Sequence, residues 1–139
     1  MNTITVQTTI VAPVRHVWDA YTQPEHIVQW AFASEEWECP EATNDVRVGG
    51  EFHTHMAAKD KSAGFDFSGT YTEVQEGKLL QYTMSGEDAR KVEVQFEKID
   101  EDTTMVTVIF DPESINPIEM QKAGWQAILD NFKKHVERK

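Results

Sequence analysis

Cysteine is nearly absent from this sequence: Cys39 stands alone, so no intrachain disulfide can form. The fold of these 139 residues therefore depends on a hydrophobic core, which a chain of this length is able to bury. A lone cysteine without a secretion signal is typical of a reducing compartment, and we expect a cytoplasmic protein. We interpret Cys39 as a small buried apolar group, because no base that would lower the pKa of its thiol is recognisable.

Positive charge is also scarce, since 13 lysines and arginines face 24 aspartates and glutamates, for a formal net charge of −11. Proteins bind nucleic acids largely through Lys and Arg side chains that neutralise phosphates, so this balance argues against DNA or RNA as a partner. No stretch approaches the roughly 20 apolar residues of a membrane span. We expect neither a nucleic acid nor a membrane as a partner.

Internal repeats, low-complexity tracts and linkers are missing as well. Hydrophobic residues make up 40% of the chain and charged residues 27%, which is ordinary for a globular protein. We therefore interpret residues 1–139 as one domain.

What the sequence does contain begins with a strand followed by two short helices. Apolar residues at every second position predict a half-buried strand over residues 4–10. Pro13 suits the first position of a helix. Pro24 ends that helix and opens a second short one with Ile27 and Trp30. The stripe that predicts the first of the two helices consists of Val14, Val17, Trp18 and Tyr21.

The middle of the chain alternates apolar and polar residues in short segments joined by tight turns, which predicts an antiparallel meander. We expect a curved sheet of about six or seven strands. The last segment is apolar at both alternating sets of positions, which indicates a central or covered strand. The segments are residues 37–39, 44–48, 52–56, 65–71, 79–84, 92–96 and 105–110.

A long helix is predicted at the C-terminal end. Asn116, Pro117 and Glu119 suit its N-cap, first turn and capping box. With roughly 20 residues it would be about 30 Å long, enough to cover the apolar face of the meander. The predicted fold is α+β, with a cavity left between sheet and helix. The apolar stripe of this helix consists of Trp125, Ile128, Leu129, Phe132 and Val136.

Four stretches also resemble a known family, and together they span nearly the whole chain. The resemblance is to the activator-of-heat-shock-protein-ninety-ATPase homologues, in the START-like (SRPBCC) superfamily that also holds the birch-pollen allergen proteins. It implies the helix-grip fold, with a hydrophobic cavity that the superfamily uses for lipids, polyketides, hormones and other apolar molecules. The stretches lie in residues 10–30, in 44–52 with its specific Asp-x-Arg-x-Gly-Gly element, in 65–74, and at Gly124-Trp125.

The resemblance transfers no reaction. The eukaryotic co-chaperone has a further N-terminal domain that contributes to chaperone binding, and this chain resembles its C-terminal domain alone. We therefore expect binding of a small hydrophobic or aromatic molecule, without a cofactor. Two alternatives stay open: an enzyme of the cyclase, aromatase or hydrolase type with a pocket tyrosine as general acid or base, or a module that binds a chaperone or another protein. Monomer and homodimer are both open.

The expected ligand-binding residues are mostly aromatic. Trp30 and Trp37 flank a loop region at the predicted mouth of the cavity, where an indole N–H finds partners. Trp125 faces either the core or the cavity, because helical spacing does not separate the two. For each residue alone, core packing is the alternative interpretation. Together, these residues supply more apolar side chains than are needed to cover one helix face. The full set is Trp30, Trp37, Phe52, Phe67, Tyr71, Tyr82, Met84, Trp125 and Leu129.

No catalytic residue and no metal site are predicted. His53 and His55 share one face of a strand, but a third ligand is not recognisable, and they alternate with Phe52 and Met56, which places them on the solvent face. We interpret the remaining histidines, His16, His26 and His135, as exposed helix residues.

Asp45 and Arg47 are separated by one residue, directly before Gly49-Gly50. We interpret these two side chains as an ion pair that supports a turn, rather than as ligand contacts.

Overall fold

The structure, a computed structural model, describes residues 3–32, 34–85 and 89–137. Its seven strands form one antiparallel sheet in the order β1-β7-β6-β5-β4-β3-β2. The elements in chain order are β1 (Ile4–Ile10), α1 (Val14–Thr22), α2 (Pro24–Trp30), β2 (Trp37–Asn44), β3 (Glu51–Ala58), β4 (Gly64–Gln75), β5 (Leu79–Met84), β6 (Lys91–Asp100), β7 (Thr103–Phe110) and α3 (Ile118–Glu137).

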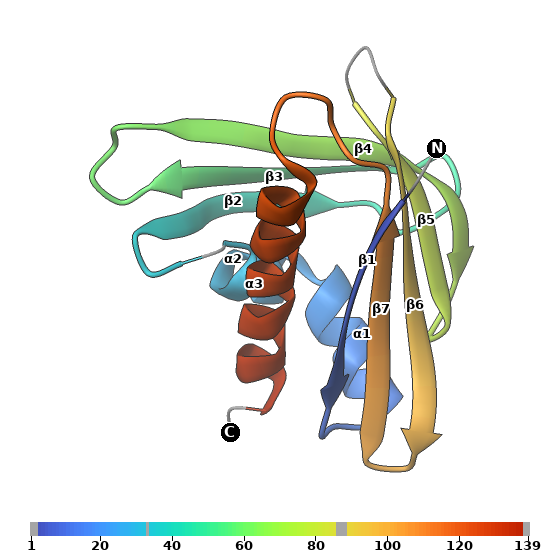
Figure 1. Cartoon of the computed structure of the whole chain (residues 1–139). Helices are drawn as coiled ribbons and strands as arrows, with labels where there is room; N and C mark the ends of the chain where they lie inside the picture. Colours follow the sequence, from blue (N-terminus) through green and yellow to red (C-terminus); the bar gives the residue numbers. More distant parts are fainter. Residues whose placement is uncertain (1–2, 33, 86–88, 138–139) are drawn as a thin grey trace.

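The sheet is strongly curled, and α3 lies against its concave side (Figure 1). In that view β2, β3 and β4 run nearly crosswise to β1, β6 and β7. The helices α1 and α2 carry the chain from one edge strand, β1, to the other, β2. The predicted α+β class, the curved sheet, the long C-terminal helix and the two short helices are confirmed, and the architecture is the helix-grip fold.

Period-two alternation decides which strand residues face α3. Along β7, Val106, Val108 and Phe110 are buried, whereas the residues between them are half-buried. The chain is apolar at both sets of positions because β7 lies inside the sheet, between β1 and β6. Each fully buried side chain of this size stabilises the fold by about 1.5–3 kcal/mol relative to an exposed one.

The helix α3 is fixed by its apolar stripe and by polar contacts near its end. Phe132 is wholly buried and packs edge-on against Trp30, with ring centroids 4.8 Å apart. The Glu137 carboxylate accepts the Val11 backbone N–H at 2.9 Å. Although α3 has 20 residues, neither it nor another helix of the described segments is long and apolar enough to cross a membrane.

One strand differs from the prediction. Residues 37–44 form a single strand, and the predicted strand over 44–48 is wrong, because the chain turns after Asn44. Pro40 is accommodated within this strand because β2 is an edge strand and because its pairing with β3 is irregular between Glu38 and Glu41.

Two helix starts also differ. The sequence places Pro13 at the first helical position, but Pro13 is the N-cap, and α1 begins one residue later at Val14. The predicted cap at Asn116 is wrong, since α3 begins at Ile118 and the backbone N–H of Gln121 donates to the Pro117 carbonyl at 3.1 Å. The Asn116 side chain instead donates to the Glu113 carboxylate at 2.8 Å, which stabilises the turn before the helix.

Candidate functional site

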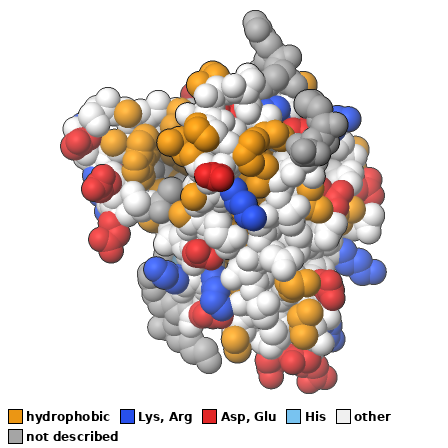
Figure 2. All heavy atoms as spheres, in the orientation of Figure 1, with side chains coloured by type: hydrophobic (Ala, Val, Ile, Leu, Met, Phe, Trp, Pro, Cys, Tyr) orange, Lys and Arg blue, Asp and Glu red, His pale blue; other side chains and the backbone are white. Residues whose placement is uncertain are grey.

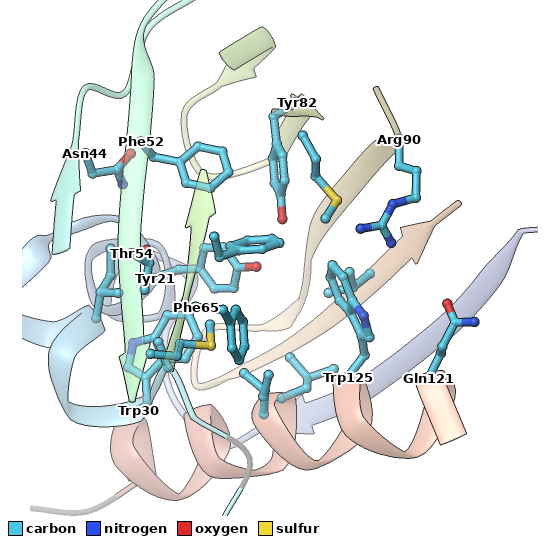
Figure 3. A pocket seen from close by; sticks show the side chains of 18 of the residues that line it. Tyr21, Trp30, Asn44, Phe52, Thr54, Phe65, Tyr82, Arg90, Gln121 and Trp125 are labelled. Atoms are coloured by element: carbon cyan, nitrogen blue, oxygen red, sulfur yellow. The ribbon is translucent and has the colours of Figure 1, made fainter. Parts of the chain in front are cut away.

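A pocket of about 270 Å³ lies between α3 and the strands β3, β4, β5 and β7 (Figure 3). Its lining is mostly aromatic and aliphatic, and the charged residues in it are Arg90 and Glu113. Figure 3 shows the Arg90 guanidinium on the same side of the pocket as Trp125. Of the predicted ligand-binding residues, those that line the pocket are Trp30, Phe52, Phe67, Tyr71, Tyr82, Met84, Trp125 and Leu129.

The two tryptophans expected at the mouth lie elsewhere. Trp30 is buried at 6% exposure, and its indole N–H donates to the Ala20 carbonyl at 2.8 Å, so the ring closes the inner end of the pocket. Trp37 is not among the residues found to line the pocket in the described part of the chain. It packs behind Phe65, which does line the pocket, at a centroid distance of 5.8 Å. Local spacing does not reveal this difference, because Trp30 belongs to α2 and Trp37 to β2, and their surroundings are decided by tertiary packing.

Trp125 faces the pocket, which decides between the two orientations that helical spacing left open. Its indole stacks on Phe110, with centroids 4.0 Å apart and planes at 13°. Phe67 meets the same indole edge-on at 5.9 Å. Trp125 is half-buried, and it lines the pocket together with Leu129 from the next turn of α3.

Phe52 is the centre of the aromatic cluster on the sheet side. Its ring lies 4.7 Å from Tyr82 and 5.5 Å from both Phe67 and Tyr71, measured between centroids. The ring occupies space above Gly69, where a Cβ atom would lie 2.9 Å from it and 2.6 Å from the Thr83 carbonyl oxygen. Gly69 therefore allows Phe52 to lie flat against the sheet and define the floor of the pocket.

Tyr71 is held by a polar chain that runs from β4 to α1. Its hydroxyl donates to the Asn44 side-chain oxygen at 2.6 Å, and the Asn44 amide donates to the Thr22 carbonyl at 2.7 Å. The Thr22 carbonyl lies in the last turn of α1, where backbone acceptors lack a helical partner. Asn44 thus satisfies two buried groups and fixes the Tyr71 ring in the lining.

The Asp-x-Arg-x-Gly-Gly element builds the turn that supports Tyr71 from the backbone side. The Gly49 N–H donates to the Tyr71 carbonyl at 2.8 Å, and the Tyr71 N–H donates to the Gly50 carbonyl at 2.9 Å. Gly50 has no room for a side chain, because a Cβ would lie 2.1 Å from the Asp45 carbonyl oxygen. The exposed side chains of Asp45 and Arg47 form the predicted ion pair at 2.8 Å, so this interpretation is confirmed.

All three tyrosines of the sequence line this one pocket. Burial raises the pKa of Tyr71 to about 12, although its hydrogen bond to Asn44 acts in the opposite direction. Burial also raises the pKa of Tyr21 and of Tyr82 well above the ordinary value, and repulsion from neighbouring phenols adds to both shifts. Tyr21 is half-buried and lies in the lining of the pocket. At neutral pH all three side chains are neutral hydroxyls.

Sequence reasoning missed Tyr21 and Arg90 as lining residues. Tyr21 belongs to the apolar stripe of α1, and this spacing indicated core packing, as for Trp18, which is buried at 7%. Arg90 directly precedes β6 and carries no local signal. The Gln121 side chain, also in the lining, donates to the Glu113 and Asn116 carbonyls and so orders the β7–α3 connection.

The histidines lie away from the pocket. His53 and His55 occupy the solvent face of β3, as predicted, and both contact Asp66 of β4, at 3.1 and 2.7 Å. The hydrogen bond from His55 is the main cause that lowers the pKa of Asp66. No group of three His, Cys, Asp or Glu side chains suited to a metal ion occurs among the described residues.

His26 and His135 differ from their predicted exposure. They are half-buried between α2 and α3, where their ring nitrogens lie 2.9 Å apart. Helical spacing could not reveal this pair, because it depends on how α2 packs against α3.

Cys39 is buried at 4% exposure, as interpreted from the sequence. Burial raises the pKa of its thiol to about 11, which leaves little nucleophilic thiolate at neutral pH.

Comparisons with known proteins agree with this geometry. The family model described as Activator of Hsp90 ATPase homolog 1-like protein matches residues 11–137. The solution structure of an AHSA1-like protein from Aeromonas hydrophila is 43% identical, covers 98% of this chain and 92% of its own, and has a TM-score of 0.89. A protein from Cytophaga hutchinsonii is 47% identical, with 99% and 93% coverage and a TM-score of 0.83.

A crystal structure from Chromobacterium violaceum, 23% identical over 100% of both chains with a TM-score of 0.87, shares the fold. The search among proteins of curated function found no match.

Proposed function

This chain belongs to the family of Activator of Hsp90 ATPase homolog 1-like proteins, and on that basis we propose that its pocket binds one small hydrophobic or aromatic molecule. The START-type fold commonly binds hydrophobic ligands, and the pocket is the feature of this chain suited to that use. Pockets for small molecules measure about 300–1,000 Å³. A volume near 270 Å³ favours a compact ligand of two or three rings over a long lipid chain.

The aromatic lining is the single observation that carries the proposal. Trp125 from α3 and the cluster around Phe52 from the sheet present ring faces and edges to the same space. Aromatic pairs favour stacked or edge-to-face contacts, so these walls are suited to a flat apolar molecule. A core that served packing alone would be filled to native density rather than left open.

The protonation of the pocket favours binding over acid–base catalysis. General acids and bases work best with a pKa near the operating pH. The pKa values of the three tyrosines are raised away from neutrality, so these residues act as neutral hydrogen-bond partners. Glu113, the carboxylate in the lining, already accepts hydrogen bonds from the Asn116 backbone and side chain.

Ligand screening with a pocket-filling variant tests the proposal. Fatty acids, flavonoids and polyketide-like compounds would be screened by native mass spectrometry and thermal shift, because a ligand that binds the folded state raises its melting temperature. Thr54→Phe places a ring into the pocket from β3. Thr70→Phe is the matched control, on the exposed face of the neighbouring strand β4.

We expect compact aromatic compounds to bind the wild-type protein and the Thr70→Phe variant alike. Thr54→Phe should weaken that binding at least about tenfold, a loss of roughly 1.4 kcal/mol. The proposal fails if no compound of the panel binds, or if Thr54→Phe binds as tightly as the wild type.

A further inference from the structure

Arg90 is the one basic residue among the described residues that line the pocket. The register of the sheet places its side chain there. The Met84 backbone N–H donates to the Arg90 carbonyl at 2.7 Å, which continues the β5–β6 pairing beyond Thr83 and Lys91. Residues paired across antiparallel strands have their side chains on the same face, and Met84 is buried in the lining. Arg90 therefore points into the pocket, as Figure 3 shows.

The two ends of the pocket differ in polarity. Arg90 lies two positions before Val92, and Val92 pairs with Phe110, on which the Trp125 indole stacks. Figure 3 shows Arg90 and Trp125 at one end of the pocket and Trp30 at the other. The Trp30 indole N–H already donates to a backbone carbonyl, so its ring presents only apolar surface. A bound molecule would thus meet a cation at one end and aromatic rings at the other.

The other polar side chains near Arg90 serve the connection between β7 and α3. The Glu113 carboxylate accepts from the backbone N–H and the amide of Asn116, at 2.6 and 2.8 Å. The Gln121 side chain accepts from the Glu113 N–H and donates to two backbone carbonyls. These bonds hold the connection in place, so Glu113 and Gln121 are structural groups of the lining.

Arg90 has donors to spare. A guanidinium carries five N–H donors, and Arg90 interacts with other parts of the chain through some of its atoms. Its Nε is nevertheless buried without a hydrogen bond in the part of the chain that the structure describes. The protein therefore does not use every donor of this side chain, and a ligand can take up part of that capacity.

The chemistry of a matching group follows from the shape and charge of the guanidinium. Arg90 is half-buried, and a cation in an apolar hollow is stabilised by an anion beside it. A carboxylate presents two oxygens in one plane, which fit the planar fork of an arginine. A phosphate carries up to about twice that charge, so the acidic Glu113 in the same lining would repel it more strongly. The net charge of −11 makes the protein as a whole repel anions, so an anion depends on direct contact with Arg90.

We propose that Arg90 binds a carboxylate, and that the ligand of this protein is a compact aromatic carboxylic acid in its ionised form. The rings of this molecule lie along Trp125 and extend toward Trp30. This inference rests on the proposed function, because it names the polar end of a molecule that the aromatic walls would hold.

Two probes of nearly equal shape separate this inference from the function on which it rests. Naphthoate carries an ionised carboxylate on two fused rings, and naphthamide carries a neutral amide at the same place. Their affinities would be measured by isothermal titration calorimetry for the wild type and three variants. Arg90→Met removes the charge and keeps an apolar stem, whereas Arg90→Lys keeps the charge and loses the planar fork. Lys91→Met is the matched control, because it removes one positive charge from the adjacent, exposed residue.

We expect the wild type and Lys91→Met to bind naphthoate at least about tenfold more tightly than naphthamide, because hydrogen bonds between opposite charges are stronger than neutral ones. Arg90→Met should lose this preference while its affinity for naphthamide stays unchanged, which also shows that the variant is folded. Arg90→Lys should fall between, since an ammonium offers a charge without the paired donors.

Equal binding of the two probes by the wild type would overturn the carboxylate site while leaving the proposed function intact. A preference for naphthoate that survives in Arg90→Met, or that Lys91→Met loses to the same extent, would overturn it as well. If Arg90→Met does not fold, an unchanged preference in Arg90→Lys overturns the paired contact. Binding of neither probe would contradict the proposed function itself, and the carboxylate site with it.

Discussion

The Tyr71 hydroxyl and the Asn44 side-chain oxygen lie 2.6 Å apart, and this bond connects the lining of the pocket to the end of α1. Replacing Asn44 by Ala leaves both the Tyr71 hydroxyl and the Thr22 carbonyl without their partner. We expect the free energy of unfolding to fall by about 1–3 kcal/mol. Tyr71→Phe alone should cost less, and chemical denaturation of the double variant should give a coupling of about 0.5–1.5 kcal/mol. Strictly additive losses would show that the bond does not contribute.

Gly69 and Gly124 should respond in opposite directions to the same substitution. At Gly69 an added methyl group meets the Thr83 carbonyl at 2.6 Å and the Phe52 ring at 2.9 Å, so Gly69→Ala should destabilise the protein by about 1–3 kcal/mol. At Gly124, inside α3, nothing lies within 4 Å of the added atom, and alanine is the better helix former. Gly124→Ala should stabilise the protein by about 0.5–1 kcal/mol in urea unfolding. Two changes of the same sign would contradict the close approach at Gly69.

The raised pKa values of the three tyrosines predict an unusual alkaline titration. A free tyrosine ionises near pH 10, but the fold raises the pKa of Tyr71 to about 12 and those of Tyr21 and Tyr82 further. Because the folded state favours the neutral form, the stabilisation is complete below the unfolded pKa and is lost as pH rises through the folded values. Tyrosinate absorbance should therefore stay flat near pH 10 and rise together with the loss of circular dichroism. A separate early step in absorbance would reveal a phenol exposed to water.

Trp125 and Phe132 lie on the same helix, and truncating each should have a different cost. Phe132 has no accessible surface, so Phe132→Ala should reduce the free energy of unfolding by about 3–5 kcal/mol. Trp125 is half-buried at an open pocket, where part of its surface already lacks protein contacts. We expect Trp125→Ala to cost about half as much in thermal or urea unfolding. Equal costs would mean that the pocket is closed around Trp125.

Strand and helix periodicity predicted the fold of this chain well, because each element buries one face. The alternation of Phe52, Thr54 and Met56 and the stripe that contains Leu129 and Phe132 are local patterns, and all five residues are buried. The errors occur where a side chain contacts another side chain outside its own helix. Asn116 donates to Glu113, three residues earlier, instead of capping α3, and His26 pairs with His135, 109 residues away.

The same distinction between local patterns and tertiary packing explains why the pocket was predicted only in part. Residues of regular strands, such as Phe67 and Tyr82, could be assigned to the concave face by counting. Trp37 could not, because tertiary packing decides that its neighbour Phe65, with a ring 5.8 Å away, lines the pocket. Hydrophobic side chains remain visible on the surface (Figure 2), and the large ones that are exposed include Phe65 at 51%, Ile118 at 52% and Met120 at 61%. Their exposure depends on tertiary packing, which residue type does not reveal.

The order of the sheet also has a consequence for how the chain reaches its native state. The first strand pairs with the last one, so that Ile4 lies opposite Phe110. The helix α3 contacts β1 through Gln126 and Lys133, and Glu137 bonds the backbone directly after that strand. Contacts between residues so far apart in sequence slow the folding of a domain. During synthesis, β1 can therefore pair with β7 and contact α3 only after nearly the whole chain has left the ribosome. Until then, the apolar face of the meander is not covered by α3.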